Sequence, residues 1–155
     1  MGVADGVAMW NENIVPLRDF GYKYFVSPAT TSAPNGLDWI MEFLARPDLL
    51  MQPNVIAVHW YDVKLEDFKA YVENFHSKTN KDIWITEFAC QNFNGGAQCT
   101  DDYIWYFIKE SVKWMDNTGW IGKYAPFGAL DLARCFTPIF IFLSRAQASC
   151  ITCKT

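Results

Sequence analysis

The sequence predicts an α/β fold in which parallel strands alternate with helices. Residues 55–61 and 82–88 are short runs of apolar, β-branched and aromatic side chains, the composition of strands buried on both faces. Helical patterns precede these runs through short connections, the arrangement of βα units in a parallel sheet. Four strands are expected, each following a helix: residues 22–26, 55–61, 83–88 and 120–127.

The first helix is expected over residues 4–20, because apolar residues recur there at helical spacing until Gly21 ends the pattern. The recurring residues are Val7, Trp10, Ile14 and Leu17. Residues 22–26 follow as the first strand, which stops at Ser27 and Pro28.

Three more helices are expected in the same way. A turn-rich stretch, residues 29–36, leads into a helix over about residues 37–44, and the next covers residues 65–76. The last runs over about residues 101–115. Thr100 is its expected N-cap, because two aspartates follow it in the first turn.

The character of the chain changes after Leu132. Residues 133–155 contain three cysteines, three basic residues and no acidic residue, and they show no helical periodicity. We therefore expect a folded domain, residues 1–132, and a poorly ordered tail, residues 133–155. The Cys150-Ile-Thr-Cys153 sequence, a single pair in so short a tail, is weak support for a metal or redox site.

Composition limits the function classes. The chain has 155 residues, 51% of them hydrophobic, enough for one core. Its net charge of −4 favours neither a nucleic-acid partner nor an anionic membrane surface. No signal-peptide pattern opens the sequence, and the longest apolar run, residues 138–143, is too short to span a bilayer. The 7 Trp, 7 Tyr and 12 Phe suit either a core or sugar-stacking platforms.

Five cysteines leave at least one without an intramolecular partner. Cys90 and Cys99 flank a Gly-rich loop, residues 91–98, that a disulfide could close, as is usual in secreted proteins. Two free thiols are the alternative.

Polar side chains end two of the expected strands: His59 and Tyr61 in one, Thr86 and Glu87 in the other. A carboxylate at the end of a buried strand is costly unless it is paired or functional, and barrel enzymes place catalytic groups at such ends. Glu87 is therefore the main candidate for a functional residue. Trp60, between His59 and Tyr61, should point to the other face of its strand and pack against a helix.

Several segments together resemble the fungal glycosyl hydrolase catalytic core family, that is glycoside hydrolase family 128, the β-1,3-glucanases of the alkali-sensitive-linkage type. The resemblance covers roughly residues 3–132. The matching segments are Tyr-Phe-Val-Ser-Pro-Ala (24–29), Gly-Leu-Asp-Trp (36–39), Val-His-Trp-Tyr (58–61), Trp-Ile-Thr-Glu-Phe-Ala (84–89) and Tyr-Ala-Pro-Phe-Gly-Ala (124–129).

The resemblance implies a (β/α)8 TIM barrel, of which this chain would be a partial barrel of about four βα units, strands five to eight. It implies β-1,3-glucan as the substrate, no cofactor or metal, and a secreted or cell-wall location. In the family one catalytic glutamate is the nucleophile, in a Trp-x-Thr-Glu-Phe motif that Glu87 matches. The other, the acid/base in an Asn-Glu-Pro motif on strand four, is expected to be missing here.

The resemblance also suggests roles for neighbouring side chains. His59 is expected to orient Glu87 or bind sugar, and Tyr61 to hydrogen-bond Glu87. Tyr124 and Phe127 are expected to stack on a glucosyl ring.

Strand alternation gives the expected faces. His59 and Tyr61 should share one face, and Glu87 should lie on the face of Ile83 and Ile85.

A retaining glycosidase needs a second carboxyl group about 5–5.5 Å from the nucleophile. Glu12, in a Trp-Asn-Glu-Asn sequence, and Asp62, just after a strand, are the two candidates in this chain. Glu12 is expected to be a solvated helix residue, because it falls within an amphipathic helix and not at a strand end, and Asn13 stands where the motif has proline. Asp62 is expected to cap a loop.

Three functional hypotheses remain open from the sequence. The chain could hydrolyse β-1,3-glucan, could bind glucan or another polysaccharide without cleaving it, or could have no independent function. In the last case, exposed sheet edges would promote self-association.

Overall fold

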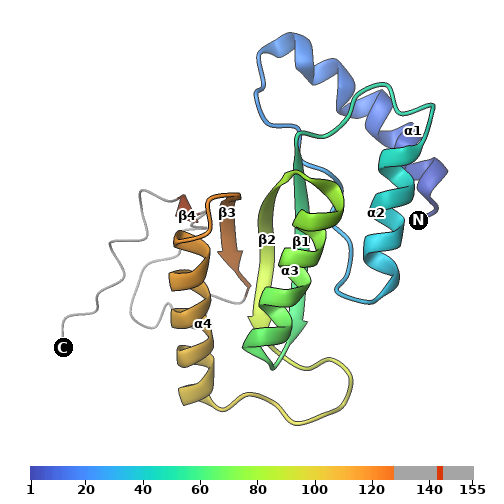
Figure 1. Ribbon diagram of the computed structural model, residues 1–155. Helices are drawn as coiled ribbons and strands as arrows, with labels where there is room; N and C mark the ends of the chain where they lie inside the picture. The colour runs from blue at the N-terminus through green and yellow to red at the C-terminus, as the bar shows by residue number, and fades with distance from the viewer. Residues whose placement is uncertain (128–142, 145–155) are drawn as a thin grey trace.

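The computed structural model describes residues 1–127 and 143–144. Its centre is a sheet of order β1-β2-β3-β4 in which β1, β2 and β3 run parallel and the short β4 pairs antiparallel with β3 (Figure 1). The strands are β1 (Val55–Asp62), β2 (Asp82–Cys90), β3 (Ile121–Pro126) and β4 (Leu143–Ser144). The α/β class and three of the four expected strands, all parallel, are confirmed.

The expected strand at residues 22–26 is wrong. This segment makes one isolated parallel bridge, between Val26 and Val55. The Asn54 side chain accepts a hydrogen bond from the Phe25 backbone N–H and donates one to the Lys23 carbonyl. An amide side chain thus takes backbone groups that a ladder would have used. The expected partial barrel of four βα units is therefore not found in the described residues.

Side chains also replace backbone pairing a little further along. The Ala57 N–H donates to the Ser27 hydroxyl at 3.0 Å, and Pro28 has no N–H to offer. Thr30 makes the next isolated bridge, with Val58. The chain therefore follows the outer edge of β1 without adding a regular strand to it.

The helices begin close to where the sequence predicts them, but the first one is divided. Helix α1 ends at Asn13, and a 3₁₀ helix, η1, follows with Pro16 in its first turn and Gly21 at φ 82° after its end. Thr100 caps α4, as predicted, by accepting a hydrogen bond from the Tyr103 N–H. The bounds are α1 (Val3–Asn13), η1 (Val15–Phe20), α2 (Asn35–Ala45), α3 (Leu65–Thr79) and α4 (Asp101–Asp116).

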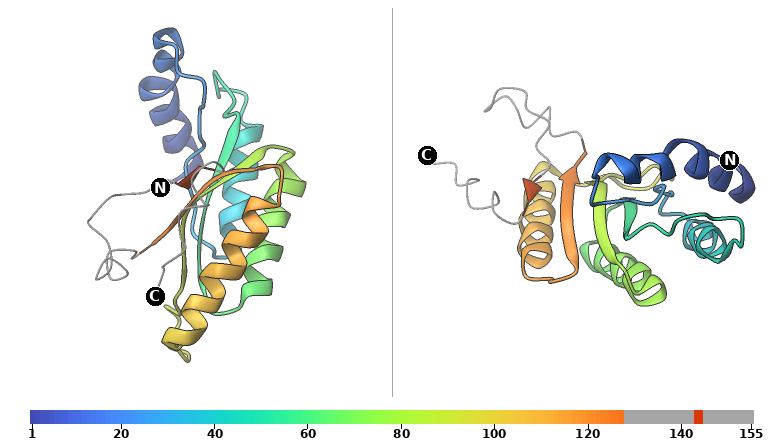
Figure 2. Two further views of the ribbon diagram at one scale, coloured as in Figure 1. Left: turned by 90° about the vertical axis from the view of Figure 1, so that its left-hand side faces the viewer. Right: turned by 90° about the horizontal axis from the view of Figure 1, so that it is seen from above.

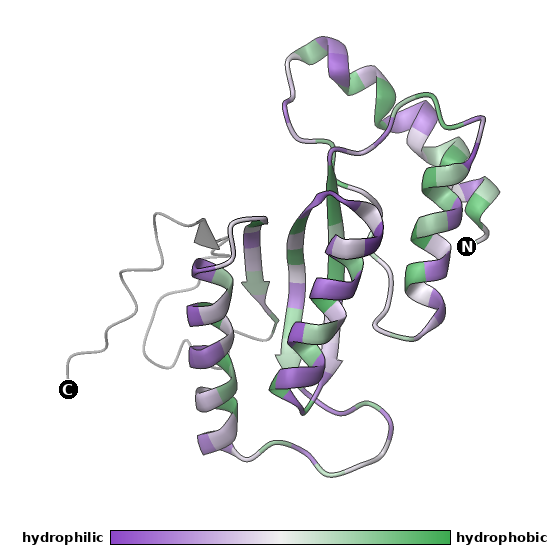
Figure 3. Ribbon diagram, viewed as in Figure 1, coloured by the Kyte–Doolittle hydropathy of each residue, from purple (hydrophilic) through white to green (hydrophobic). Residues whose placement is uncertain are grey.

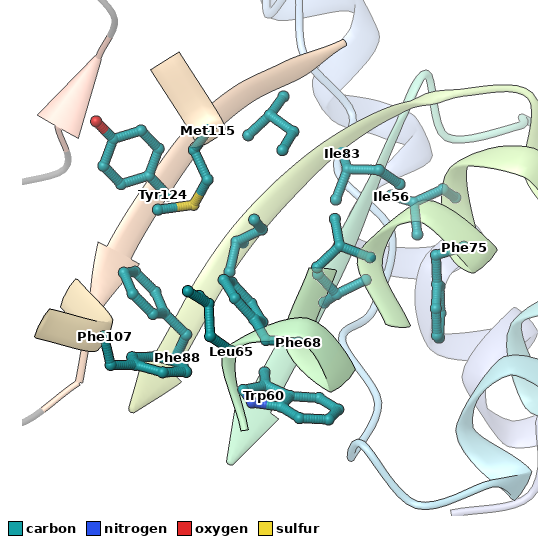
Figure 4. Packing of buried hydrophobic residues seen from close by; sticks show 14 of the residues in the cluster. Ile56, Trp60, Leu65, Phe68, Phe75, Ile83, Phe88, Phe107, Met115 and Tyr124 are labelled. Carbon is teal, nitrogen blue, oxygen red and sulfur yellow. The ribbon is translucent and has the colours of Figure 1, made fainter. Parts of the chain in front are cut away.

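The main core lies between the sheet and helices α3 and α4, which cover one of its faces (Figures 1 and 2). The apolar residues of α4 point toward the sheet and its polar residues point away (Figure 3). Phe68 of α3 is central. Its ring stacks on Phe88 of β2 at 5.4 Å and lies 5.7 Å from Phe107 of α4 (Figure 4). Aromatic packing therefore joins two helices to the middle strand.

A smaller apolar cluster joins α1 to α2. It contains Val7, Trp10 and Phe43, and the indole N–H of Trp10 donates to the Met51 carbonyl at 2.8 Å. This contact fixes the end of α1 beside the segment that enters β1, at the amino-terminal end of the sheet.

The tail expected at residues 133–155 lies outside the described residues, except for Leu143 and Ser144 in β4. The prediction that it is poorly ordered stays a prediction. No helix in the described part of the chain is long and apolar enough to cross a membrane.

Candidate active site

The carboxyl-terminal halves of β1 and β2 bring together the polar residues singled out in the sequence. Trp60 points to the helices, with its ring 5.1 Å from Tyr71 and 5.9 Å from Phe68. His59 and Tyr61 therefore lie on the opposite face, as strand alternation predicts.

A β-bulge at Thr86 places Glu87 on the same face as these two residues. In the register of β1 and β2, Val58 pairs with Ile85 but His59 pairs with Glu87, so Thr86 is one extra residue. Ile85 before the bulge and Phe88 after it are both fully buried on the helix side. The expectation that Glu87 shares a face with Ile83 and Ile85 is therefore wrong.

The carboxylate of Glu87 is held by both residues of β1. The Tyr61 hydroxyl donates to Oε2 of Glu87 at 2.5 Å, and Nδ1 of His59 lies 3.5 Å from the same oxygen. The side chains of His59 and Glu87 are 28% and 36% exposed. Glu87 is thus oriented through one oxygen and open to solvent in part.

Burial raises the pKa of Tyr61, and the hydrogen bond to Glu87 and its negative charge raise it further. The phenol therefore stays protonated at neutral pH, which is the form that donates a hydrogen bond. Tyr61 acts here as a neutral donor that fixes the carboxylate.

The two aromatic residues expected to stack on sugar differ in position. Phe127 is 57% exposed, and its ring lies 5.5 Å from Tyr61. Tyr124 is only 2% exposed and points to the helix side, where its hydroxyl donates to Asp116 at 2.7 Å. Burial also raises the pKa of Tyr124. The expectation that Tyr124 stacks on a glucosyl ring is therefore wrong.

Phe93 is a residue of this site that the sequence analysis did not identify. It is 69% exposed, and its ring lies 5.2 Å from Tyr61. The available signal was a single aromatic residue in a Gly-, Asn- and Gln-rich loop that starts just after the Glu87 strand. A disulfide between Cys90 and Cys99 closes this loop.

Neither candidate for the second carboxylate points at Glu87. Glu12 is exposed near the end of α1, and its neighbour Asn11 binds the segment that precedes β1, at the other end of the sheet. Asp62 alternates away from Tyr61, and its Oδ1 accepts a hydrogen bond from the Val63 N–H at 2.7 Å.

The side chain of Glu87 stays partly exposed in the part of the chain that the structure describes. A shallow cavity of about 410 Å³ lies between the disulfide-closed loop and the start of α4, and its lining does not include Glu87. Among the described residues, the site is thus a set of oriented side chains on the face of the sheet opposite α3 and α4.

Comparison with known proteins places these features in a family. The glycosyl hydrolase catalytic core model matches residues 1–145. Alkali-sensitive linkage protein 1 of Schizosaccharomyces pombe is 28% identical over 126 residues, which are 80% of this chain and 23% of that protein.

Two solved structures are similar in fold. One is a family 128 (subgroup VI) exo-β-1,3-glucanase from Aureobasidium namibiae, with a TM-score of 0.72 and 25% identity over 95% of this chain and 55% of that one. The other is a family 128 (subgroup VII) oligosaccharide-binding protein from Cryptococcus neoformans, with a TM-score of 0.70 and 25% identity over 81% of this chain and 49% of that one. The chain thus spans about half the length of these solved relatives. It belongs to the glycosyl hydrolase catalytic core family, with structural neighbours in glycoside hydrolase family 128.

Proposed function

We propose that this chain carries the nucleophile side of a retaining β-1,3-glucanase site, with Glu87 as the nucleophile. The main support is the geometry of one carboxylate: Glu87 stands near the carboxyl end of a parallel strand, with Tyr61 and His59 both at its Oε2. Neither contact involves Oε1. That oxygen is the one we assign to attack on an anomeric carbon.

The acid/base is the part of the mechanism that this chain does not supply in our proposal. Glu12 lies on α1 next to Asn11, which binds the segment before β1, and the carboxylate of Asp62 accepts a hydrogen bond from the Val63 N–H. The solved relatives are about twice as long as the matched region, so we assign the second carboxylate to the part of such a longer chain that has no counterpart here. The chain alone is therefore proposed to bind glucan without efficient cleavage.

The expected loss follows from the chemistry of the leaving group. Without a positioned acid the sugar oxygen must depart unprotonated, and general acid–base assistance is worth about 10²–10⁴ in rate. If the rest of the sugar-binding cleft lies in the part of the relatives that this chain does not match, the substrate is also less well oriented, which lowers the rate further. An aryl β-glucoside has a better leaving group and needs less help from an acid.

A paired assay tests this proposal. Turnover of laminari-oligosaccharides and of an aryl β-glucoside is measured for the chain and for Glu87→Gln. We expect no oligosaccharide turnover and slow aryl glucoside turnover that Glu87→Gln abolishes. Robust, Glu87-dependent cleavage of the oligosaccharide would show that an acid/base is present, and Glu12 and Asp62 would be mutated first.

Non-catalytic oligosaccharide binding is the second candidate. It is favoured by the similarity to an oligosaccharide-binding member of family 128. On this reading His59, Tyr61 and the exposed aromatic residues hold sugar, and Glu87 is a hydrogen-bond acceptor. Glucan pull-down without any Glu87-dependent turnover of the aryl glucoside would favour it over the first candidate.

Location and association are further parts of the proposal. The Cys90–Cys99 disulfide supports an oxidising compartment, consistent with a secreted or cell-wall protein. The outer edge of β1, where the described residues add only isolated bridges, would allow self-association. Size-exclusion chromatography that gives only monomer at high concentration would exclude that association.

A further inference from the structure

The disulfide-closed loop, residues 91–98, is polar except for Phe93 and Ala97. Phe93 is 69% exposed and so gains little from the fold by burying its ring. A single exposed aromatic ring on a surface needs no explanation, but one beside the candidate nucleophile Glu87 indicates a binding role.

The loop is held by its own side chains. The Gln98 amide donates to the Asn92 carbonyl at 2.7 Å and accepts a hydrogen bond from the Asn92 N–H at 3.0 Å. The side chain of Asn92 accepts a bond from the Asn94 N–H at 2.7 Å. With the Cys90–Cys99 disulfide, these bonds fix both ends and the interior of the loop. Phe93 is therefore presented on a constrained support.

The ring stands next to the residue that orients Glu87. The planes of the Phe93 and Tyr61 rings are inclined at 64°, and those of Phe127 and Tyr61 at 80°. Both phenylalanine rings therefore make edge-to-face contacts with Tyr61. Neither ring is buried by the described residues: Phe93 is 69% and Phe127 57% exposed. Two aromatic rings thus flank the tyrosine whose hydroxyl binds the carboxylate.

We propose that the disulfide-closed loop forms one wall of the sugar site and that Phe93 stacks on a glucosyl unit adjoining the one at Glu87. The substituents of a β-glucosyl ring are equatorial, so its axial C–H bonds form apolar faces that pack on an aromatic ring. This inference rests on the proposed function and adds a site residue and a role for the disulfide. Phe93 is a binding residue, and Cys90 and Cys99 are positioning residues.

Binding to laminaritetraose, measured by calorimetry with the intact chain, tests the proposal. Phe93→Ala should raise Kd roughly threefold to tenfold, the range expected for loss of one aromatic contact. Phe93→Trp should keep most of the affinity, whereas Phe93→Leu should not, because Leu is apolar without an aromatic face. Phe20→Ala is the matched control and should leave the affinity unchanged. Phe20 is also an exposed phenylalanine (77%), but it lies at the end of η1, ahead of the segment that runs beside the amino end of β1.

The role of the disulfide is tested by a double-mutant cycle. Cys99→Ser should weaken binding as Phe93→Ala does, and the two changes together should cost little more than either one, because both remove the same ring from its place. Thermal unfolding of each variant shows whether the fold is intact at the temperature of the assay.

The outcomes separate this inference from the proposed function. Unchanged affinity in Phe93→Ala, with sugar still bound by the chain, overturns the inference and leaves the proposed function in place. Equal losses in Phe93→Trp and Phe93→Ala, or additive losses in the cycle, also overturn it. Absence of any binding by the intact chain overturns both.

Discussion

On the face of the sheet that α3 and α4 cover, the strands present side chains such as Ile85 and Phe88, which are fully buried. On the opposite face the same strands present His59, Tyr61 and Glu87, which remain partly exposed and are held by polar contacts at one carboxylate oxygen. The first face is fixed by packing and the second by a few directed contacts. Substitutions on the two faces should therefore affect different measurements.

The largest expected effect is on the covered face. Phe68→Ala should lower the free energy of unfolding by about 3–5 kcal/mol, because it empties the centre of the core beside Phe88 and Phe107. Urea denaturation followed by circular dichroism measures the change. Phe93→Ala is the control from the open face and should change stability by less than about 0.5 kcal/mol. Similar losses in the two variants would contradict the distinction between the faces.

Smaller effects are expected at two aromatic residues of the last parallel strand: Tyr124 within β3 and Phe127 just after it. Tyr124→Phe removes the hydrogen bond to Asp116 and should cost about 1 kcal/mol of stability, with unchanged affinity for laminari-oligosaccharides. Phe127→Ala should do the reverse: Kd rises roughly threefold to tenfold while stability stays within about 0.5 kcal/mol. Chemical denaturation and calorimetry on both variants check this, and weaker sugar binding by Tyr124→Phe would contradict it.

Alkaline titration gives a subtler test of the open face. Burial and then Glu87 raise the pKa of Tyr61 above that of a free tyrosine, about 10. The folded state therefore retains this proton to higher pH than the unfolded state. The resulting stabilisation is fully present below about pH 10 and is lost as the pH rises through the folded-state pKa.

Glu87→Gln should lower the pKa of Tyr61, because it removes the negative charge, while burial keeps the pKa above that of a free tyrosine. The measurement is a titration of the Tyr61 ring carbon by NMR, assigned with Tyr61→Phe. An unchanged titration in Glu87→Gln would show that the carboxylate does not act on the phenol.

The smallest effect is expected from the tail. Deleting residues 133–155 removes the pairing of Leu143 and Ser144 with β3, which involves only two residue pairs. Secondary-structure content and solubility should stay the same or improve. A large fall in the midpoint of thermal unfolding would show instead that the tail replaces the last helix of the family barrel.

The face of the sheet that the helices cover could be predicted from the sequence, because burial makes apolar residues recur at regular spacing along strands and helices. The alternation around Trp60 placed His59 and Tyr61 correctly. Helical spacing located α2, α3 and α4 within three residues at each end, but it did not show the division of the first helix after Asn13. Glu87 was recognised as a candidate because a carboxylate in such a strand is costly. Its face was not, because the bulge at Thr86 shifts the alternation by one residue and leaves no mark in the pattern.

The other errors have the same kind of cause. Residues 22–26 have the composition of a strand, but the Asn54 side chain, from a distant part of the sequence, occupies two of their backbone groups, the Phe25 N–H and the Lys23 carbonyl. Tyr124 looked suited to sugar stacking, but its place in the sheet turns it to Asp116. Phe93 was missed because its importance depends on the folding of a loop onto Tyr61. Each error involves a contact between residues that are not neighbours in the sequence.

The bulge at Thr86 lets one strand serve both faces of the sheet with large side chains. Ile85 before it and Phe88 after it both fill the core, and the extra residue between them turns Glu87 to the opposite face. Removing the extra residue would therefore exchange the faces of Glu87 and Phe88 relative to Ile85. Transplanting the site to another scaffold would require moving the bulged segment Ile85 to Ala89 together with the strand that carries His59 and Tyr61.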